Sequence, residues 1–168
     1  MIRMEVNLVD LILHPPVQNS LKPMICAFSD EIRFTFKEDV TLYLQTAELL
    51  CYAPQEILIE KCRAAMTRGR YKVRDTLDLV MLKRHCRLDI FDSEDEIKKK
   101  VRFTVDRFDR YLSNFNTDSL PMDVATLENE MILLIIPRPP NLIEEMIEVN
   151  GHLNELKEEI SRSLEGPT

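Results

Sequence analysis

The sequence has few of the features that mark membrane-spanning, secreted or metal-binding proteins. It contains no tryptophan, three glycines and three histidines among 168 residues. Its longest apolar run, MILLIIP at 131–137, is much shorter than the roughly 20 apolar residues that a membrane span needs. The N-terminus lacks the apolar core and small-residue cleavage site of a signal peptide. We therefore expect a soluble, cytoplasmic protein that makes no membrane contact.

The cysteines show no metal-binding or disulfide pattern. Cys26, Cys51, Cys62 and Cys86 have no Cys-x-x-Cys spacing, and the histidines are equally scattered. We expect reduced, partly buried thiols in an intracellular protein. The acidic run DIFDSEDE at 89–96 has two interpretations, a metal site or the start of a helix, and the helix start is favoured because Ser93 followed by Glu96 fits a capping box.

Charge is distributed unevenly along the chain. The net charge is −5 over residues 1–60 and −8 over residues 111–168, whereas residues 61–110 carry 15 Lys/Arg against 9 Asp/Glu, a net +6. A local basic excess can attract a phosphate-bearing ligand although the whole chain is acidic. It can equally be the solvated face of helices. Nucleic-acid binding by this region is a weaker hypothesis, because aromatic residues that could stack on bases are sparse there.

The N-terminal third has strand-like patterns. Residues 2–9 alternate between apolar and polar side chains, with Glu5 on the polar face, and predict a strand. The prolines and turn formers of residues 14–23 predict a loop. Residues 31–39 alternate again, and residues 40–53 are rich in β-formers, so we expect two or three further short strands before Pro54.

From Pro54 the pattern becomes helical. Pro54 and Gly69 fit the start and the stop of a first helix, residues 71–86 predict a second, and residues 94–114 predict a third. The apolar residues of the C-terminal segment follow a four-three alternation, interrupted by Gly151, that is typical of a helix packed along another helix. They are residues 142, 146, 149, 153, 156 and 160. This helix could pack on its own domain or against a partner protein.

Four charged residues of the first two predicted helices could form a site. Small and apolar neighbours surround Lys61, so its ammonium group needs a partner. Asp75 and Asp78 share one helical stripe, and Arg74 precedes Asp78 by four residues. Partly buried carboxylates are costly unless they are paired. The spacing allows an internal salt-bridge network that clips two helices together, or a site that presents Lys61 and Arg74 to a triphosphate.

The run YAPQEILIEKCRAAMTRGRYKVRDTLDLVML at 52–82 resembles the signature region of the AbiEii/AbiGii family of nucleotidyltransferase toxins. The shared elements occur in the family's order: Glu56, Glu60-Lys61, Ala64, a basic turn at 68–72, Arg74-Asp75 and Asp78-Leu79. Upstream, IRMEVNL resembles the family strand that carries the last of three active-site carboxylates, here Glu5. The resemblance extends over residues 2–115 and is looser in the tail.

The resemblance implies an α+β fold, with a partial nucleotidyltransferase-like β layer at 1–53 and a helical C-terminal region at 54–168. The implied reaction transfers a nucleotide from an NTP to an RNA or protein acceptor, with Mg²⁺ bridging carboxylates and phosphates. Lys61, Asp75 and Asp78 would be catalytic, Lys61 and Arg74 would bind the nucleotide, and Glu5 would bind the metal. As the toxin of a toxin–antitoxin or phage-defence pair, the protein would have an antitoxin or another protein partner.

One family motif does not occur in this sequence. The family has a Gly-Ser turn followed by an Asp-x-Asp strand that supplies the main metal ligands, whereas here no glycine precedes a serine and no Asp-x-Asp is present. A single carboxylate such as Glu5 would hold Mg²⁺ poorly. We therefore expect either an enzyme that is incomplete in this chain, its metal-binding half encoded elsewhere or lost, or a degenerate, non-catalytic interaction module in which the charged cluster is structural.

Overall fold

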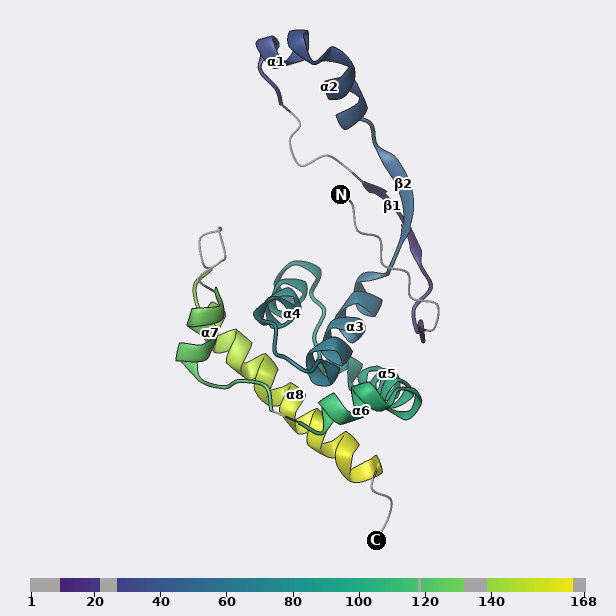
Figure 1. Ribbon diagram of the computed structural model, residues 1–168, viewed down its shortest axis with the longest axis vertical. Helices are drawn as coiled ribbons and strands as arrows, with labels where there is room; N and C mark the ends of the chain where they lie inside the picture. The colour runs from purple at the N-terminus through teal and green to yellow at the C-terminus, as the bar shows by residue number, and fades with distance from the viewer. Residues whose placement is uncertain (1–9, 22–26, 118, 132–138, 165–168) are drawn as a thin grey trace. The chain divides into compact units, whose positions relative to one another are not determined.

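The computed structural model describes residues 10–21, 27–117, 119–131 and 139–164 (Figure 1). The described elements are, in chain order, β1 (Val17–Leu21), α1 (Asp30–Thr35), α2 (Lys37–Tyr43), β2 (Ala47–Cys51), α3 (Pro54–Thr67), α4 (Val73–Cys86), the 3-10 turn η1 (Phe91–Ser93), α5 (Glu94–Arg107), α6 (Asp109–Phe115), α7 (Val124–Met131) and α8 (Leu142–Leu164). The predicted α+β fold with a helical C-terminal region is confirmed.

Contacts divide the chain into two compact units. The hairpin unit is His14–Ala53, and the helical unit combines Met1–Leu13 with Pro54–Thr168. The assignment of residues 1–53 and 54–168 to separate functional domains stays a prediction.

The hairpin unit is built on two antiparallel strands. β1 pairs with β2 in a register that places Val17 opposite Cys51 and Leu21 opposite Ala47, and α1 and α2 lie between the strands in sequence. The prediction of a loop over residues 14–23 was wrong, because β1 occupies Val17–Leu21. The two prolines at 15 and 16 come just before the strand, where the missing N–H group of proline costs no ladder hydrogen bond.

The prediction of a strand over residues 31–39 was also wrong, because α1 and α2 cover this segment. Ser29 is the N-cap of α1, and its Oγ accepts a hydrogen bond from the Ile32 N–H at 3.4 Å. Acidic residues occupy the first turn of the helix. No residue of α1 or α2 is buried, so no apolar core enforces the alternating pattern as a strand. Of the strands predicted over 40–53, β2 is present. The strand predicted at 2–9 lies outside the described residues.

The helical unit follows the predicted helix pattern closely. α3 begins at Pro54 and ends at Thr67, two residues before Gly69. α4 corresponds to the helix predicted at 71–86 and begins two residues later, at Val73. α3 packs against α4, α5 and α6, and α8 contacts α3, α4, α5 and α7. In Figure 1 the long α8 runs along the unit, with α7 beside its first turns.

The predicted C-terminal helix and its packing against other helices are confirmed by α8. All six apolar residues of that stripe are buried: Leu142, Met146, Val149, Leu153, Leu156 and Ile160. They pack with apolar residues of α3, α4 and α5, so within the described structure this helix serves its own unit. The predicted interruption at Gly151 was wrong, because α8 continues through it. A Cβ at Gly151 would lie 3.2 Å from Met122 Cε, so glycine here permits close packing.

The helix predicted at 94–114 is divided into α5 and α6. Phe108 has an extended backbone (φ −136°, ψ 106°), and Asp109 begins the next helix with a favourable acidic residue in its first turn. Ser93 is the N-cap of α5 as predicted, but its side chain makes no capping hydrogen bond. The reason is that η1 leads directly into α5, which leaves Ser93 without the extended conformation that a capping serine usually adopts (φ −120°, ψ 14°).

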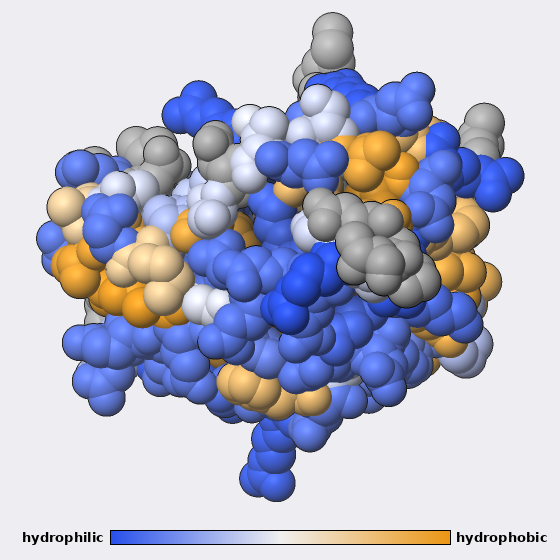
Figure 2. Space-filling model, turned by 90° about the horizontal axis from the view of Figure 1, so that it is seen from below, coloured by the Kyte–Doolittle hydropathy of each residue, from blue (hydrophilic) through white to orange (hydrophobic). Residues whose placement is uncertain are grey.

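The surface of the protein is mainly hydrophilic on the face that Figure 2 shows, with small apolar patches between polar side chains. Among the described helices, none combines the length and the apolar character that crossing a bilayer requires. The described cysteines, Cys51, Cys62 and Cys86, are free thiols. Cys62 is buried and Cys51 is half-buried, whereas Cys86 is exposed, contrary to the expected partial burial. Burial raises the pKa of the Cys62 thiol.

Candidate functional site

Three of the predicted site residues meet between α3 and α4. The Lys61 Nζ lies 3.2 Å from Asp75 Oδ1 and 2.5 Å from Asp78 Oδ2. Arg68 completes the group, since its Nη1 donates to Asp75 Oδ2 at 2.5 Å. We call these four residues the Lys61 cluster. In it the predicted catalytic lysine contacts both predicted catalytic aspartates.

The geometry of the two helices explains why these residues meet. Lys61 lies in the middle of α3, whereas Asp75 lies in the first turn of α4, where the unpaired N–H groups of a helix start favour a carboxylate. Asp78 follows Asp75 by three residues and therefore faces α3 from the same side of α4. The short turn between Thr67 and Val73 brings the two helices side by side.

The four side chains of the cluster differ in their exposure to solvent. The Asp75 side chain is 2% exposed, those of Lys61 and Arg68 are 27% and 34% exposed, and that of Asp78 is 46% exposed. Both oxygens of the buried Asp75 carboxylate are thus held by cations, as a buried charge requires. A ligand would reach the cluster from the side of Lys61 and Asp78.

The ammonium group of Lys61 is stabilised in its charged form. Burial alone would lower the pKa of Lys61, but the hydrogen bonds and charges of Asp78 and Asp75 outweigh it and raise the pKa above its ordinary value. Lys61 is therefore protonated at neutral pH in the free protein. This favours a role in binding negative charge over a role as general base.

Arg74 and Glu5 are not part of the described cluster. Arg74 is exposed on α4, and the guanidinium that reaches Asp75 comes from Arg68. Glu5 lies outside the described residues. The sequence interpretation missed Arg68 because it precedes Asp75 by seven residues across a turn, and helical spacing relates residues only within one helix. Its presence in the basic turn of the signature region was the available signal.

A second charged cluster is buried on the other side of α3. The fully buried Lys100 Nζ contacts Glu56 Oε1 and lies 3.4 Å from both Asp10 Oδ1 and Glu60 Oε2. The second oxygen of Glu56 accepts the Leu13 N–H at 2.9 Å, which fixes the segment before the hairpin unit to α3. We call Asp10, Glu56, Glu60 and Lys100 the Lys100 cluster.

The carboxylates of this cluster keep Lys100 charged. Burial alone would lower the pKa of Lys100, but the hydrogen bond to Glu56 and the charges of Glu60 and Asp10 raise it above its ordinary value. The sequence contained a signal that was not used. Lys100 falls three residues after Ile97 and four before Thr104, on the stripe of α5 that faces the core. A lysine at such a position is rarely buried without a partner.

The described residues contain no ready-made group of metal ligands. Among them, no three His, Cys, Asp or Glu side chains are grouped so that they could hold a metal ion. The three carboxylates that do converge, in the Lys100 cluster, surround an ammonium group. In the acidic run at 89–96, Asp89 pairs with Lys83 at 3.0 Å and Glu94 with Lys98 at 3.4 Å, and Glu94 begins α5, in agreement with the interpretation as a helix start.

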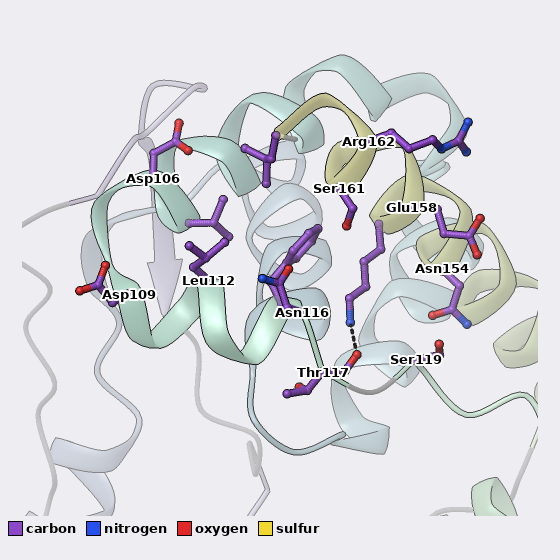
Figure 3. Close-up of a pocket in the computed structure, with 14 residues that line it drawn as sticks. Asp106, Asp109, Leu112, Asn116, Thr117, Ser119, Asn154, Glu158, Ser161 and Arg162 are labelled. Atoms are coloured by element: carbon purple, nitrogen blue, oxygen red, sulfur yellow. Dashed lines mark hydrogen bonds between the residues drawn. The ribbon is translucent and has the colours of Figure 1, made fainter. Parts of the chain in front are cut away.

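A pocket of about 920 Å³ lies away from the Lys61 cluster, between α5, α6 and the C-terminal half of α8 (Figure 3). Figure 3 shows Asp106 and Asp109 on the side of α5 and α6, and Glu158 and Arg162 on the side of α8. Its mixed charge gives no clear preference for an anionic or a cationic ligand.

Comparison with known proteins identifies the chain over most of its length. A model of the family described as "Nucleotidyl transferase AbiEii toxin, Type IV TA system" matches residues 1–163. No curated protein and no solved structure matches the chain. Membership of a type IV toxin–antitoxin family implies an antitoxin partner, and the nucleotidyltransferase description implies the use of an NTP in general.

Proposed function

The chain belongs to the AbiEii family of nucleotidyltransferase toxins, and from this premise we propose that it transfers a nucleotide from an NTP to an acceptor at the Lys61 cluster. In this reaction an acceptor hydroxyl forms a bond to the α-phosphorus, the bond to pyrophosphate breaks, and the hydroxyl proton leaves. Catalysis depends mainly on positioning and on compensating the charge of the phosphates.

The observation that carries this proposal is the placement of Lys61 between Asp75 and Asp78. The buried Asp75 holds Lys61 and Arg68 in place, so that two positive groups are fixed at the same carboxylate. Fixed cations stabilise the developing charge of a phosphoryl transfer without reorganisation during the reaction. We assign Lys61 to the phosphates and Asp75 to positioning. Asp78, the most exposed member, is the candidate to accept the proton of the acceptor hydroxyl.

In the described part of the site, Lys61 and Arg68 are the groups that would compensate the negative charge of the phosphates. The predicted metal ligand Glu5 lies outside the described residues, and the family's Asp-x-Asp pattern does not occur in the sequence. Both carboxylates of the Lys61 cluster are occupied by Lys61 and Arg68. The roles of Arg74 in binding the nucleotide and of Glu5 in binding Mg²⁺ remain predictions from the resemblance.

A second function is favoured by one specific observation. All four members of the Lys61 cluster are paired with each other, which is what a structural clip between α3 and α4 requires. Under this alternative the protein is a non-catalytic interaction module, and its partner is the antitoxin or another protein.

Labelled NTPs separate the two functions. The purified full chain is incubated with each of the four α-³²P-labelled NTPs and with total cellular RNA or protein as acceptor. We expect incorporation of label, and we expect Lys61→Ala to lower the rate at least about 100-fold, as removal of a group that stabilises transition-state charge does. The matched control is Lys99→Ala, an exposed lysine of α5, which should leave the rate unchanged.

Two results would contradict the proposal. One is incorporation that Lys61→Ala leaves unchanged. The other is the absence of incorporation with every NTP and both acceptors, which would favour the interaction module. Thermal unfolding of each variant shows whether a lost rate reflects the site or the fold.

A further inference from the structure

A fully buried asparagine of α8 lies against the first turn of α4. Asn150 is 0% exposed, and an amide group is costly to bury unless its donors and its acceptor are hydrogen-bonded. It stands among the buried apolar residues of α8, next to Val149 and three residues before Leu153. The hydrogen-bond partners of Asn150 therefore show which parts of the structure it holds together.

These partners form a closed set of hydrogen bonds. The Tyr71 hydroxyl donates to Thr76 Oγ1 at 3.0 Å, and Thr76 Oγ1 donates to Asn150 Oδ1 at 2.9 Å. Asn150 Nδ2 donates to the Tyr71 hydroxyl at 3.4 Å and to the Pro121 carbonyl at 2.7 Å. We call the side chains of Tyr71, Thr76 and Asn150 the Asn150 network. Buried hydrogen bonds that share their groups in this way strengthen one another.

The Asn150 network lies directly beside the Lys61 cluster. Asp75 binds Lys61 and Arg68 through its two carboxylate oxygens. Thr76 is the next residue of α4 and binds Tyr71, which lies in the same turn between α3 and α4 as Arg68. Two neighbouring residues of α4 thus hold the two ends of this turn. Through Thr76, the network connects this part of the site to α8.

The start of α4 depends on such contacts because it has no capping side chain. Lys72 is the N-cap residue, and its side chain makes no capping hydrogen bond. The first N–H groups of a helix have no partner within the helix, and helix ends tend to fray. Asp75 lies in this first turn. The hydrogen bond between Thr76 and Asn150 joins the turn to the interior of the 23-residue α8 and so limits the movement of the Asp75 carboxylate.

We propose that Thr76 and Asn150 are positioning residues of the site, which keep the Asp75 carboxylate in contact with Lys61 and Arg68. The proposal rests on the proposed function for the reaction, and both residues act on that reaction only through Asp75. A misplacement of about 1 Å in a site can lower the rate of a reaction about 100-fold. Loss of the network should therefore lower the transfer rate although neither residue contacts the nucleotide.

Two substitutions of Thr76 separate positioning from stability. Thr76→Val keeps the shape of the side chain but removes the hydroxyl that Asn150 and Tyr71 bind. Thr76→Ser keeps this hydroxyl and loses a buried methyl group. Both substitutions should lower the midpoint of urea unfolding, because one leaves a buried acceptor unpaired and the other leaves a small cavity. Only Thr76→Val should disturb the position of Asp75.

The matched control is Asn154→Ala, one turn further along α8 (Figure 3). The Asn154 side chain accepts the Leu120 N–H at 2.8 Å and donates to the Leu120 carbonyl at 3.1 Å. The control variant therefore loses a tie between α8 and the segment before α7 but keeps the tie between α8 and α4. It should lower stability without an effect on the site.

The pKa of Lys61 reports the position of Asp75 without any transfer reaction. Burial alone would lower this pKa, and Asp78 and Asp75 together raise it. The pKa is measured by NMR titration of the lysine side chains in folded protein, and the Lys61 signal is assigned by its absence from Lys61→Arg. We expect Thr76→Val to lower the pKa of Lys61 toward its ordinary value, whereas Thr76→Ser and Asn154→Ala should leave it unchanged.

The labelled-NTP assay gives the second measurement. Thr76→Val should lower the transfer rate about tenfold or more, and Thr76→Ser and Asn154→Ala should change it less than about twofold. An unchanged pKa of Lys61 in folded Thr76→Val would overturn the proposal, as would a changed pKa with an unchanged rate. If Thr76→Val does not fold, Thr76→Val/Asn150→Leu is measured in its place, because it removes both polar partners together.

The positioning role and the proposed function can fail separately. If the pKa of Lys61 depends on the Thr76 hydroxyl but the unsubstituted protein transfers no label, the link between the network and Asp75 stands and the proposed function falls. If transfer depends on Lys61 but is equally fast in Thr76→Val, the proposed function stands and the positioning role falls.

Discussion

Replacement of Lys100 by methionine should destabilise the helical unit more than any other single lysine substitution considered above. The change keeps most of the side-chain stem and removes the ammonium group that Glu56, Glu60 and Asp10 surround. Glu56 and Lys100 are both fully buried. After the substitution, the Glu56 carboxylate would remain buried without the ammonium group, with the Leu13 N–H among its contacts and two further carboxylates nearby.

The expected loss of stability is about 3–5 kcal/mol, the usual cost of removing one partner of a buried ion pair. This figure rests on Glu56 alone, because Asp10 and Glu60 are partly exposed and water screens their charges. A loss of this size is a third or more of the total for many domains, whose stability is about 5–15 kcal/mol. Glu56→Gln keeps an acceptor for Leu13, so the double variant with Lys100→Met should recover part of the loss.

Urea unfolding followed by far-UV circular dichroism measures these differences, with Lys99→Met as the exposed control on the same helix. The control should lie within about 0.5 kcal/mol of the unsubstituted protein. Since the pKa of Lys100 is raised in the folded state, its stabilisation is complete below the unfolded pKa of about 10.4 and is lost as the pH rises through the folded value. Lys100→Met should lack this alkaline loss. A loss below about 1 kcal/mol for Lys100→Met, or additive single and double variants, would refute the reasoning.

Two further predictions concern the ends of α4 and the charge of Lys61. Arg87 caps α4 with a left-handed backbone (φ 57°), so Arg87→Gly should stabilise the protein by about 0.5–1 kcal/mol in the same urea assay, and a loss of stability would contradict this. The raised pKa of Lys61 means that its charge is kept up to alkaline pH, so the transfer rate should not increase through deprotonation of Lys61 between pH 7 and 9. A pH–rate profile that rises with a pKa assigned to Lys61, and that loses this rise in Lys61→Arg, would show that Lys61 acts as a base.

The helical part of the fold could be predicted because the apolar residues that repeat with helical spacing there are also the residues that the core buries. The six apolar residues of α8 repeat with helical spacing, and every one of them is buried against other helices. The N-terminal third lacks this agreement. Ile32, Phe34 and Phe36 alternate as in a strand, but all three are exposed, so the local signal of Ser29 and the acidic first turn decides in favour of a helix.

In the candidate site, local sequence patterns predict some of the side chains and not others. Lys61, Asp75 and Asp78 could be predicted because a signature region and helical spacing both point to them. Arg68 and Lys100 could not be placed in the same way. Arg68 reaches Asp75 across a turn, and Lys100 meets Glu56 across 44 residues, so only the packing of α3 against its neighbours brings these groups together.

The central claim, that the Lys61 cluster transfers nucleotides through a fixed positive charge, is tested most directly by comparing Lys61→Ala and Lys61→Arg in the labelled-NTP assay. The account predicts that alanine lowers the rate of incorporation at least about 100-fold. Arginine should retain a larger part of the rate because the charge is kept, and Lys99→Ala should have no effect. Equal incorporation by the unsubstituted protein and Lys61→Ala would contradict the account.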